Sequence, residues 1–219
     1  MKIAIITDAW EPQINGVVRT LKATTEELRK MGHKVTIFSH IGHRTIACPG
    51  YPSIRVAIFP AKKLTRDLET INPDAIHIAT EGPLGIAARR WCLKNKISFT
   101  TSYHTQFPEY LRLRLPIPLS LSYAWFRRFH SKATSTLVPT ASQKKRLTDR
   151  GFRHVKVWGR GVDTTLFTPN HAKELDYPKP IMVYMGRISV EKNIGAFLSL
   201  DMPGTKLIIG DGPDLEMLK

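Results

Sequence analysis

Polar residues follow several short apolar runs of the chain, which is where ligands bind in an open α/β sheet. The first such loop comes after the run Lys2–Thr7 and contains Asp8, Asn15 and Gly16. A glycine directly before a helix lets backbone N–H groups approach an anion, and the helix dipole favours a phosphate there. The GxGxxG spacing of a dinucleotide site is absent, and on spacing alone an ordinary turn is the alternative explanation of Asn15 and Gly16.

Two further loops hold groups that can bind a sugar hydroxyl or exchange a proton. Glu81 follows the apolar run Ala75–Ala79 and either contacts a ligand hydroxyl or caps the helix that begins there. His104 follows the run Ile97–Tyr103. A histidine at a strand end can donate or accept a proton, or hydrogen-bond a sugar. A purely structural histidine is the alternative.

The loop after Pro180–Met185 carries two cations, Arg187 and Lys192, at a predicted strand-to-helix turn. Two cations at a helix N-terminus are suited to a diphosphate, although surface Arg and Lys residues are the plain alternative. Gly210 and Gly212 end the next strand in a tight turn that is placed to meet a nucleotide.

These loops require a scaffold in which strands and helices alternate, and the hydrophobic pattern predicts one. Strands are expected at 2–7, 34–39, 53–59, 75–79, 97–103, 136–139, 155–158, 180–185 and 206–209. Helices are expected at 17–31, 65–71, 85–95, 119–133, 141–150 and 193–200. This alternation predicts an α/β fold with a doubly wound parallel sheet, Rossmann-like. We expect an N-terminal domain over 1–170, a linker over 171–179, and the incomplete beginning of a second Rossmann-like domain over 180–219.

The composition limits the class of protein and its compartment. The chain has 33 Lys and Arg against 18 Asp and Glu, a net charge of +15, which suits a phosphate-rich partner or a solvated basic surface. Cys48 and Cys92 fit no metal or disulfide spacing, which favours a reducing compartment. The N-terminus does not resemble a signal peptide and no apolar run is long enough to span a bilayer. A cytoplasmic protein is therefore expected, peripheral on the inner face of the membrane if it binds lipid.

Most of the excess positive charge lies between Tyr103 and Arg160, where the acidic residues are Glu109 and Asp149. If a helix begins near Leu119, the side chains of Leu119, Tyr123 and Phe126 lie on one of its faces. A basic amphipathic segment of this kind can lie on an anionic membrane; a core-packing helix with a charged outer face is the alternative. The membrane-facing candidates are Arg112, Arg114, Trp125, Arg127 and Arg128.

Five short motifs occur in order along the chain. They are Asn15-Gly16-Val17, Tyr103-His104-Thr105 through Pro108-Glu109-Tyr110, Gly159-Arg160-Gly161-Val162-Asp163, Gly186-Arg187 through Glu191-Lys192-Asn193, and Gly210-Asp211-Gly212-Pro213. Together they resemble family 4 of the retaining glycosyltransferases, enzymes of the GT-B fold. The likeness is nearest to the mannosyl- and hexosyltransferases that act on membrane glycolipids.

The resemblance implies transfer of a hexose, such as mannose, from a GDP- or UDP-sugar to a lipid or glycan acceptor with retention of configuration. Arg187 and Lys192 would hold the donor diphosphate, with backbone N–H groups of Gly16, and His104 would contact the donor sugar near the reacting carbon. No metal or other cofactor is expected, because fixed cations can stabilise the leaving diphosphate. The expected contacts of the acceptor or sugar are Asp8, Asn15, Glu81, Tyr103 and Tyr110.

One departure from the family pattern keeps a second reading open. The family places two acidic residues, seven apart, late in its second domain, and this sequence ends before them. A catalytically incomplete fragment that only binds is therefore the alternative to an active transferase. A basic nucleic-acid-binding protein is disfavoured, because no aromatic stacking platform or recognised module is present. A different GT-B enzyme, a phosphorylase or an epimerase, is disfavoured by the ordered motifs.

Overall fold

The computed structural model describes residues 1–48, 51–169 and 174–218. Contacts divide the chain into two compact units. Unit 1 comprises Met1–Arg112 and Ile117–Arg160, and unit 2 comprises Leu113–Pro116 and Gly161–Lys219. The expected domain limits of 1–170, 171–179 and 180–219 stay predictions, and residues 170–173 and 219 lie outside the described part of the chain.

Unit 1 is built on a six-stranded sheet in the order β2-β1-β5-β6-β7-β8. Every neighbouring pair in it is parallel, so the carboxyl ends of all six strands lie at one edge. The predicted doubly wound, Rossmann-like sheet is therefore confirmed. The strands are β1 Lys2–Ile6, β2 Lys34–Phe38, β5 Ala75–Ile78, β6 Thr100–Ser102, β7 Ser135–Val138 and β8 Val155–Val157.

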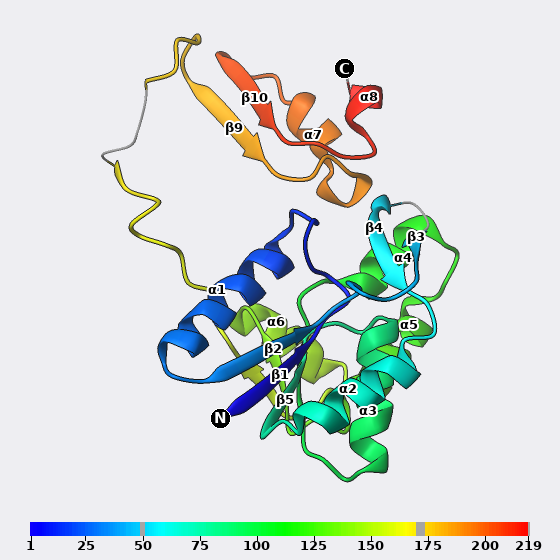
Figure 1. Ribbon diagram of the computed structural model, residues 1–219. Coiled ribbons are helices and arrows are strands. Elements are labelled where there is room, and N and C mark those ends of the chain that lie inside the picture. Colours follow the sequence, from blue (N-terminus) through cyan, green and yellow to red (C-terminus); the bar gives the residue numbers. More distant parts are fainter. Residues whose placement is uncertain (49–50, 170–173, 219) are drawn as a thin grey trace. The chain divides into compact units, whose positions relative to one another are not determined.

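Helices cover both faces of this sheet. The chain moves from β1 to β2 in one direction and from β5 through β8 in the other, and right-handed crossovers then place the connecting helices on opposite faces. Accordingly α1 (Gly16–Lys30) covers one face, and α2 (Ala61–Ile71), α3 (Pro83–Lys94) and α5 (Leu119–His130) cover the other (Figure 1). Helix α6 (Ala141–Asp149) joins α5 in a second apolar cluster on β7 and β8.

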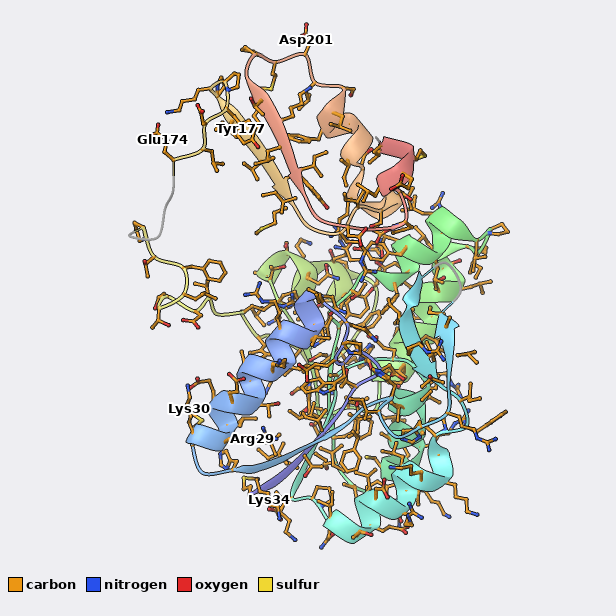
Figure 2. The ribbon with its side chains drawn as sticks, turned by 45° about the horizontal axis from the view of Figure 1, so that its top comes forward. Arg29, Lys30, Lys34, Glu174, Tyr177 and Asp201 are labelled. Carbon is orange, nitrogen blue, oxygen red and sulfur yellow. The ribbon has the colours of Figure 1, made fainter. Side chains whose placement is uncertain are left out.

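Helix α1 shows why these residues form a helix at this place. Asn15 caps its N-terminus by accepting hydrogen bonds from the backbone N–H groups of Val17 and Val18. Arg29 and Lys30 lie in its last turn, where positive charge favours the helix dipole (Figure 2). The Arg29 side chain also donates to the carbonyl of Val35, 3.1 Å away, and so fastens the end of α1 to β2.

Two elements of unit 1 were not expected from the sequence. Strands β3 (Thr45–Cys48) and β4 (Tyr51–Ala57) form an antiparallel hairpin, of which only the second strand was predicted. Helix α4 (Phe107–Arg114) occupies what was treated as a loop. Pro108 is the second residue of this helix, and proline is well tolerated in the first turn, where its missing N–H has no partner to lose.

Unit 2 contains a second parallel pair, β9 (Ile181–Met185) and β10 (Thr205–Ile209), as predicted. Between them lie a 3-10 turn, η2 (Val190–Lys192), and helix α7 (Ile194–Leu198), and helix α8 (Leu215–Leu218) follows. Across the parts of the chain that the structure describes, none of the helices is both long enough and apolar enough to cross a membrane.

Candidate functional site

Asp8, at the carboxyl end of β1, is half-buried and accepts hydrogen bonds from the start of helix α3. Its Oδ1 accepts from the N–H of Leu84 at 2.9 Å, and its Oδ2 accepts from the hydroxyl of Thr80 at 2.8 Å and the N–H of Gly85 at 3.4 Å. Burial raises the pKa of this carboxyl, against the opposing effect of these hydrogen bonds. A Cβ on Gly82 would lie 2.4 Å from the Asp8 Cγ. The expected sugar contact is thus, in this structure, the cap of helix α3.

Asn15 and Gly16 have different surroundings at the start of helix α1. The Asn15 Oδ1 accepts from Val17 and Val18 at 3.0 Å, so its side chain is a helix cap. Gly16 is exposed at the first position of α1, where a backbone N–H has no partner within the helix. A Cβ on Gly16 would lie 3.3 Å from Nη1 of Arg160. The glycine therefore leaves room for a guanidinium beside the helix N-terminus.

His104 lies at the carboxyl end of β6 and is held by the same guanidinium. Nη2 of Arg160 is 3.2 Å from Nδ1 of His104. A guanidinium can only donate, so Nδ1 must accept, and the ring proton of the neutral histidine is on Nε2. Burial, with a smaller effect of the nearby positive charge of Arg160, lowers the pKa of His104 to about 3. His104 is therefore a neutral hydrogen-bond donor rather than a strong base.

Sequence reasoning missed three residues around His104. Arg160 belongs to a motif that was recognised, yet it was given no role. The ring of Trp158 packs against the rings of His104 and His77, with its centroid 6.3 Å and 6.1 Å from theirs. The two ring nitrogens of His77 are hydrogen-bonded, Nδ1 to Thr100 at 2.8 Å and Nε2 to Ser102 at 2.9 Å. The available signal was positional: Trp158 follows a strand that ends at the same edge as β6.

Glu81 and Tyr103 are part of the interior rather than of an open surface. The Glu81 Oε1 lies 3.3 Å from Nε2 of His130, with 5% and 1% of the two side chains exposed. The two atoms are close enough for an ion pair but are not aligned as a hydrogen bond. Tyr103 is 1% exposed and packs among aromatic rings that include Phe152. Tyr110 is half-buried on α4.

In unit 2, Arg187 comes directly after β9 and Lys192 ends the 3-10 turn η2. The helix after this turn has 5 residues, shorter than expected, so its dipole adds little to the two cations. Gly210 and Gly212 have a packing role, since a Cβ on them would lie 1.8 Å from the Gly186 carbonyl oxygen and 1.9 Å from that of Ile188. The turn therefore closes directly on the loop that carries Arg187.

Helix α5, in the basic segment, has a buried face and an exposed face. Its buried face is the one for which the sequence analysis named Tyr123 and Phe126. Tyr123 and Phe126 are 4% and 5% exposed and belong to the core. Leu121 and Trp125 are 64% and 44% exposed instead. Of the basic candidates, Arg112, Arg127 and Arg128 are exposed, and the side chain of Arg114 lies outside what the structure describes.

The structure is that of a Rossmann-like α/β domain in which the loops of unit 1 that carry the candidate residues gather at the carboxyl edge of a parallel sheet. The model of Glycosyltransferase Family 4 matches residues 14–166, and the chain belongs to this family. Its sheet is that of the N-terminal domain of a GT-B fold.

Curated relatives with related activities are similar along most or all of the chain. A GDP-mannose-dependent alpha-mannosyltransferase of Mycobacterium tuberculosis is 26% identical over 100% of this chain and 65% of its own length. The sulfoquinovosyl transferase of Arabidopsis thaliana is 28% identical over 87% of the chain and 44% of its own length. An alpha-monoglucosyldiacylglycerol synthase of Streptococcus pneumoniae is 26% identical over 100% of the chain. The chain spans 58% of that synthase, and so under two thirds of each of the three.

Proposed function

We propose that the chain functions in a retaining glycosyltransferase that moves a hexose, mannose being the first choice, from a GDP- or UDP-sugar to a lipid or glycan acceptor. The observation that carries this proposal is His104, a neutral Nε2–H donor fixed by Arg160 at the carboxyl edge of the sheet. The printed activities of the relatives, mannosyl, sulfoquinovosyl and glucosyl transfer, supply the substrate class.

In this proposal His104 binds the donor sugar but does not take the acceptor proton. With Nδ1 held by Arg160 and the pKa lowered to about 3, the ring is a poor proton acceptor near neutral pH. The bond between the anomeric carbon and the phosphate oxygen breaks while the acceptor oxygen bonds to the same face of that carbon. The acceptor proton passes to the leaving phosphate, so a carboxylate nucleophile has no part in the reaction.

The leaving diphosphate is assigned to fixed positive charge. Arg187 and Lys192 of unit 2 are the cations that this proposal assigns to it. Oriented cations and N–H groups stabilise charge that develops on a leaving group. In the described residues no group of three or more His, Cys, Asp or Glu side chains is arranged to hold a metal ion; a metal-independent reaction stays a prediction.

The acceptor side includes a membrane surface in this proposal. Phe107, Leu121 and Trp125 form a patch that we call the aromatic patch: Phe107 and Trp125 both contact the ring of Phe126, and all three are exposed. Arg128 lies on the same side of α5 as Leu121 and Trp125, because residues three and four apart share a helix face. Apolar side chains with neighbouring arginines suit an anionic lipid surface, such as one that holds a lipid acceptor.

Incubation of the chain with labelled GDP-mannose or UDP-glucose and lipid acceptors tests the proposal. Sugar transfer is expected, with a product of the same anomeric configuration as the donor. His104→Ala should lower the rate on the order of 100-fold, because it removes a donor to the transition state. His33→Ala is the matched control, since His33 precedes β2 at the opposite edge of the sheet. Binding of the sugar nucleotide without any turnover would favour the alternative of an incomplete, binding-only transferase.

A further inference from the structure

A cavity of unit 1 lies where β6 and β7 end and helix α6 begins. It has a volume of about 220 Å³. Its wall includes the side chains of His104, Gln106, Thr140, Ser142, Gln143 and Arg146. Thr140 caps α6 by accepting from the N–H of Gln143 at 3.1 Å, and the first turn of this helix contains no acidic residue. The positive end of the helix dipole is thus directed at the cavity wall.

A chain of hydrogen bonds fixes the orientation of the two side-chain amides in the cavity wall. Nη1 of Arg146 donates to Oε1 of Gln106 at 2.6 Å, and Nε2 of Gln106 then donates to Oε1 of Gln143 at 3.5 Å. The Nε2 of Gln143 is the group that remains, and it is buried without a hydrogen-bond partner. Gln143 itself is 8% exposed. A buried N–H donor without a partner is costly unless a ligand satisfies it.

The other functional groups of the wall are donors as well. His104, with Nδ1 engaged by Arg160, presents Nε2–H, and this atom too is buried without a partner. Arg146 adds a permanent positive charge. Glu109 partly offsets it, with its Oε1 3.9 Å from Nη1 of Arg146, although Glu109 is not part of the cavity wall. N–H donors, a guanidinium and a helix N-terminus around one cavity select a ligand that is rich in acceptors and negatively charged.

We propose that this cavity binds a phosphate group. The residues that line it all belong to unit 1, whereas Arg187 and Lys192 belong to unit 2. Gln143 Nε2 and the Arg146 guanidinium are its donors, and the Nε2–H of His104 at the same wall stays assigned to the donor sugar. The binding of phosphate itself does not depend on the proposed function. The identification of this phosphate as part of an acceptor headgroup does rest on it. The acceptor would then be a phosphorylated molecule rather than a neutral sugar.

Titration of the 219-residue chain with inorganic phosphate, in the absence of any sugar nucleotide, tests the proposal. The readouts are heat of binding and the side-chain amide signal of Gln143 in a ¹⁵N-labelled sample, identified by its absence in Gln143→Leu. Wild type should bind saturably, with a shift of this amide signal. Arg146→Gln should weaken binding about tenfold or more, because it removes the charge from a charge-assisted contact. Lys145→Gln is the matched control, since Lys145 is 78% exposed and pairs with Asp149.

Each outcome decides the matter. Equal phosphate affinity in Arg146→Gln and wild type, or no shift of the Gln143 amide, would overturn the proposal, and so would equally tight binding of neutral glycerol. Glycerol 1-phosphate separates the two sources of phosphate. Tighter binding than inorganic phosphate supports an acceptor headgroup, and equal binding supports a site for free phosphate. Loss of sugar transfer alone would bear on the proposed function and would leave these binding results unchanged.

Discussion

At the scale of single residues, Arg160 determines what His104 can do. Arg160→Met should free Nδ1, so that both tautomers of the neutral ring become populated. Because burial is the larger cause of the low value, the pKa of His104 should rise only part of the way from about 3 toward 6.5. Long-range ¹H–¹⁵N spectra of the imidazole, recorded across pH, measure both effects. Arg153→Met, at an exposed arginine elsewhere, should change neither, and an unchanged tautomer in Arg160→Met would refute the assignment.

Asp8 makes a prediction about stability rather than about catalysis. Asp8→Ala leaves the N–H groups of Leu84 and Gly85 without their acceptor at the start of α3. The loss of a helix cap costs about 0.5–2 kcal/mol, and a buried donor without a partner adds to it. Urea denaturation should therefore show a lower free energy of unfolding. Glu11 lies in the same loop as Asp8, and its exposed carboxylate pairs with Lys22 of α1. Glu11→Ala should therefore show a much smaller change.

At the scale of elements, helix α5 exposes Leu121 and Trp125, the part of the aromatic patch that would meet a membrane. Leu121→Ser with Trp125→Ser should lower binding to anionic vesicles by on the order of tenfold, because each side chain loses apolar surface to bury. Binding of the wild type should also weaken as salt is raised. Co-sedimentation measures both. Met31→Ser, 72% exposed at the end of α1, is the control for loss of a surface apolar side chain. A wild type that fails to bind vesicles at low salt would end the membrane proposal.

Local patterns predicted the elements well but not their long-range partners. Strand β1 followed from a continuous apolar run, because a parallel strand inside a sheet is buried on both faces. The stripe of Tyr123 and Phe126 was found correctly, yet periodicity could not tell whether it faced lipid or the core. The tautomer of His104 depends on a residue 56 positions away, and the burial of Glu81 depends on His130. Such pairs exist only after the sheet brings the loops together.

At the scale of the whole molecule, buried histidines make stability depend on pH. Burial lowers the pKa of His77 to about 4 from 6.5. The folded value lies below the unfolded one, so the unfolded chain takes up the proton first as pH falls. The contribution of His77 is therefore present above pH 6.5 and lost between 6.5 and about 4. Asp8, with its raised pKa, acts in the opposite sense.

Comparison of two variants isolates this effect. Unfolding free energies measured in urea across this range should decline less steeply with falling pH in His77→Gln than in wild type, because the variant has no imidazole to protonate. His33→Gln, in which a half-buried histidine at the start of β2 is replaced, should keep the wild-type slope. An identical slope in His77→Gln would show that His77 does not titrate in this window.

The strand order β2-β1-β5-β6-β7-β8 also determines in which sequence the sheet can form while the ribosome is still making the chain. Of the strands of this sheet β1 (Lys2–Ile6) is made first and becomes an inner strand, and β2 joins it after one helix. Strand β5 then pairs with β1, and from β6 onward each new strand docks on the strand made before it. Each strand after β1 therefore meets a partner strand that has already been made, and the pairing of β5 with β1, which joins distant parts of the chain, is the slow step. The carboxyl edge that carries His104 is then completed last, when Arg160 is made.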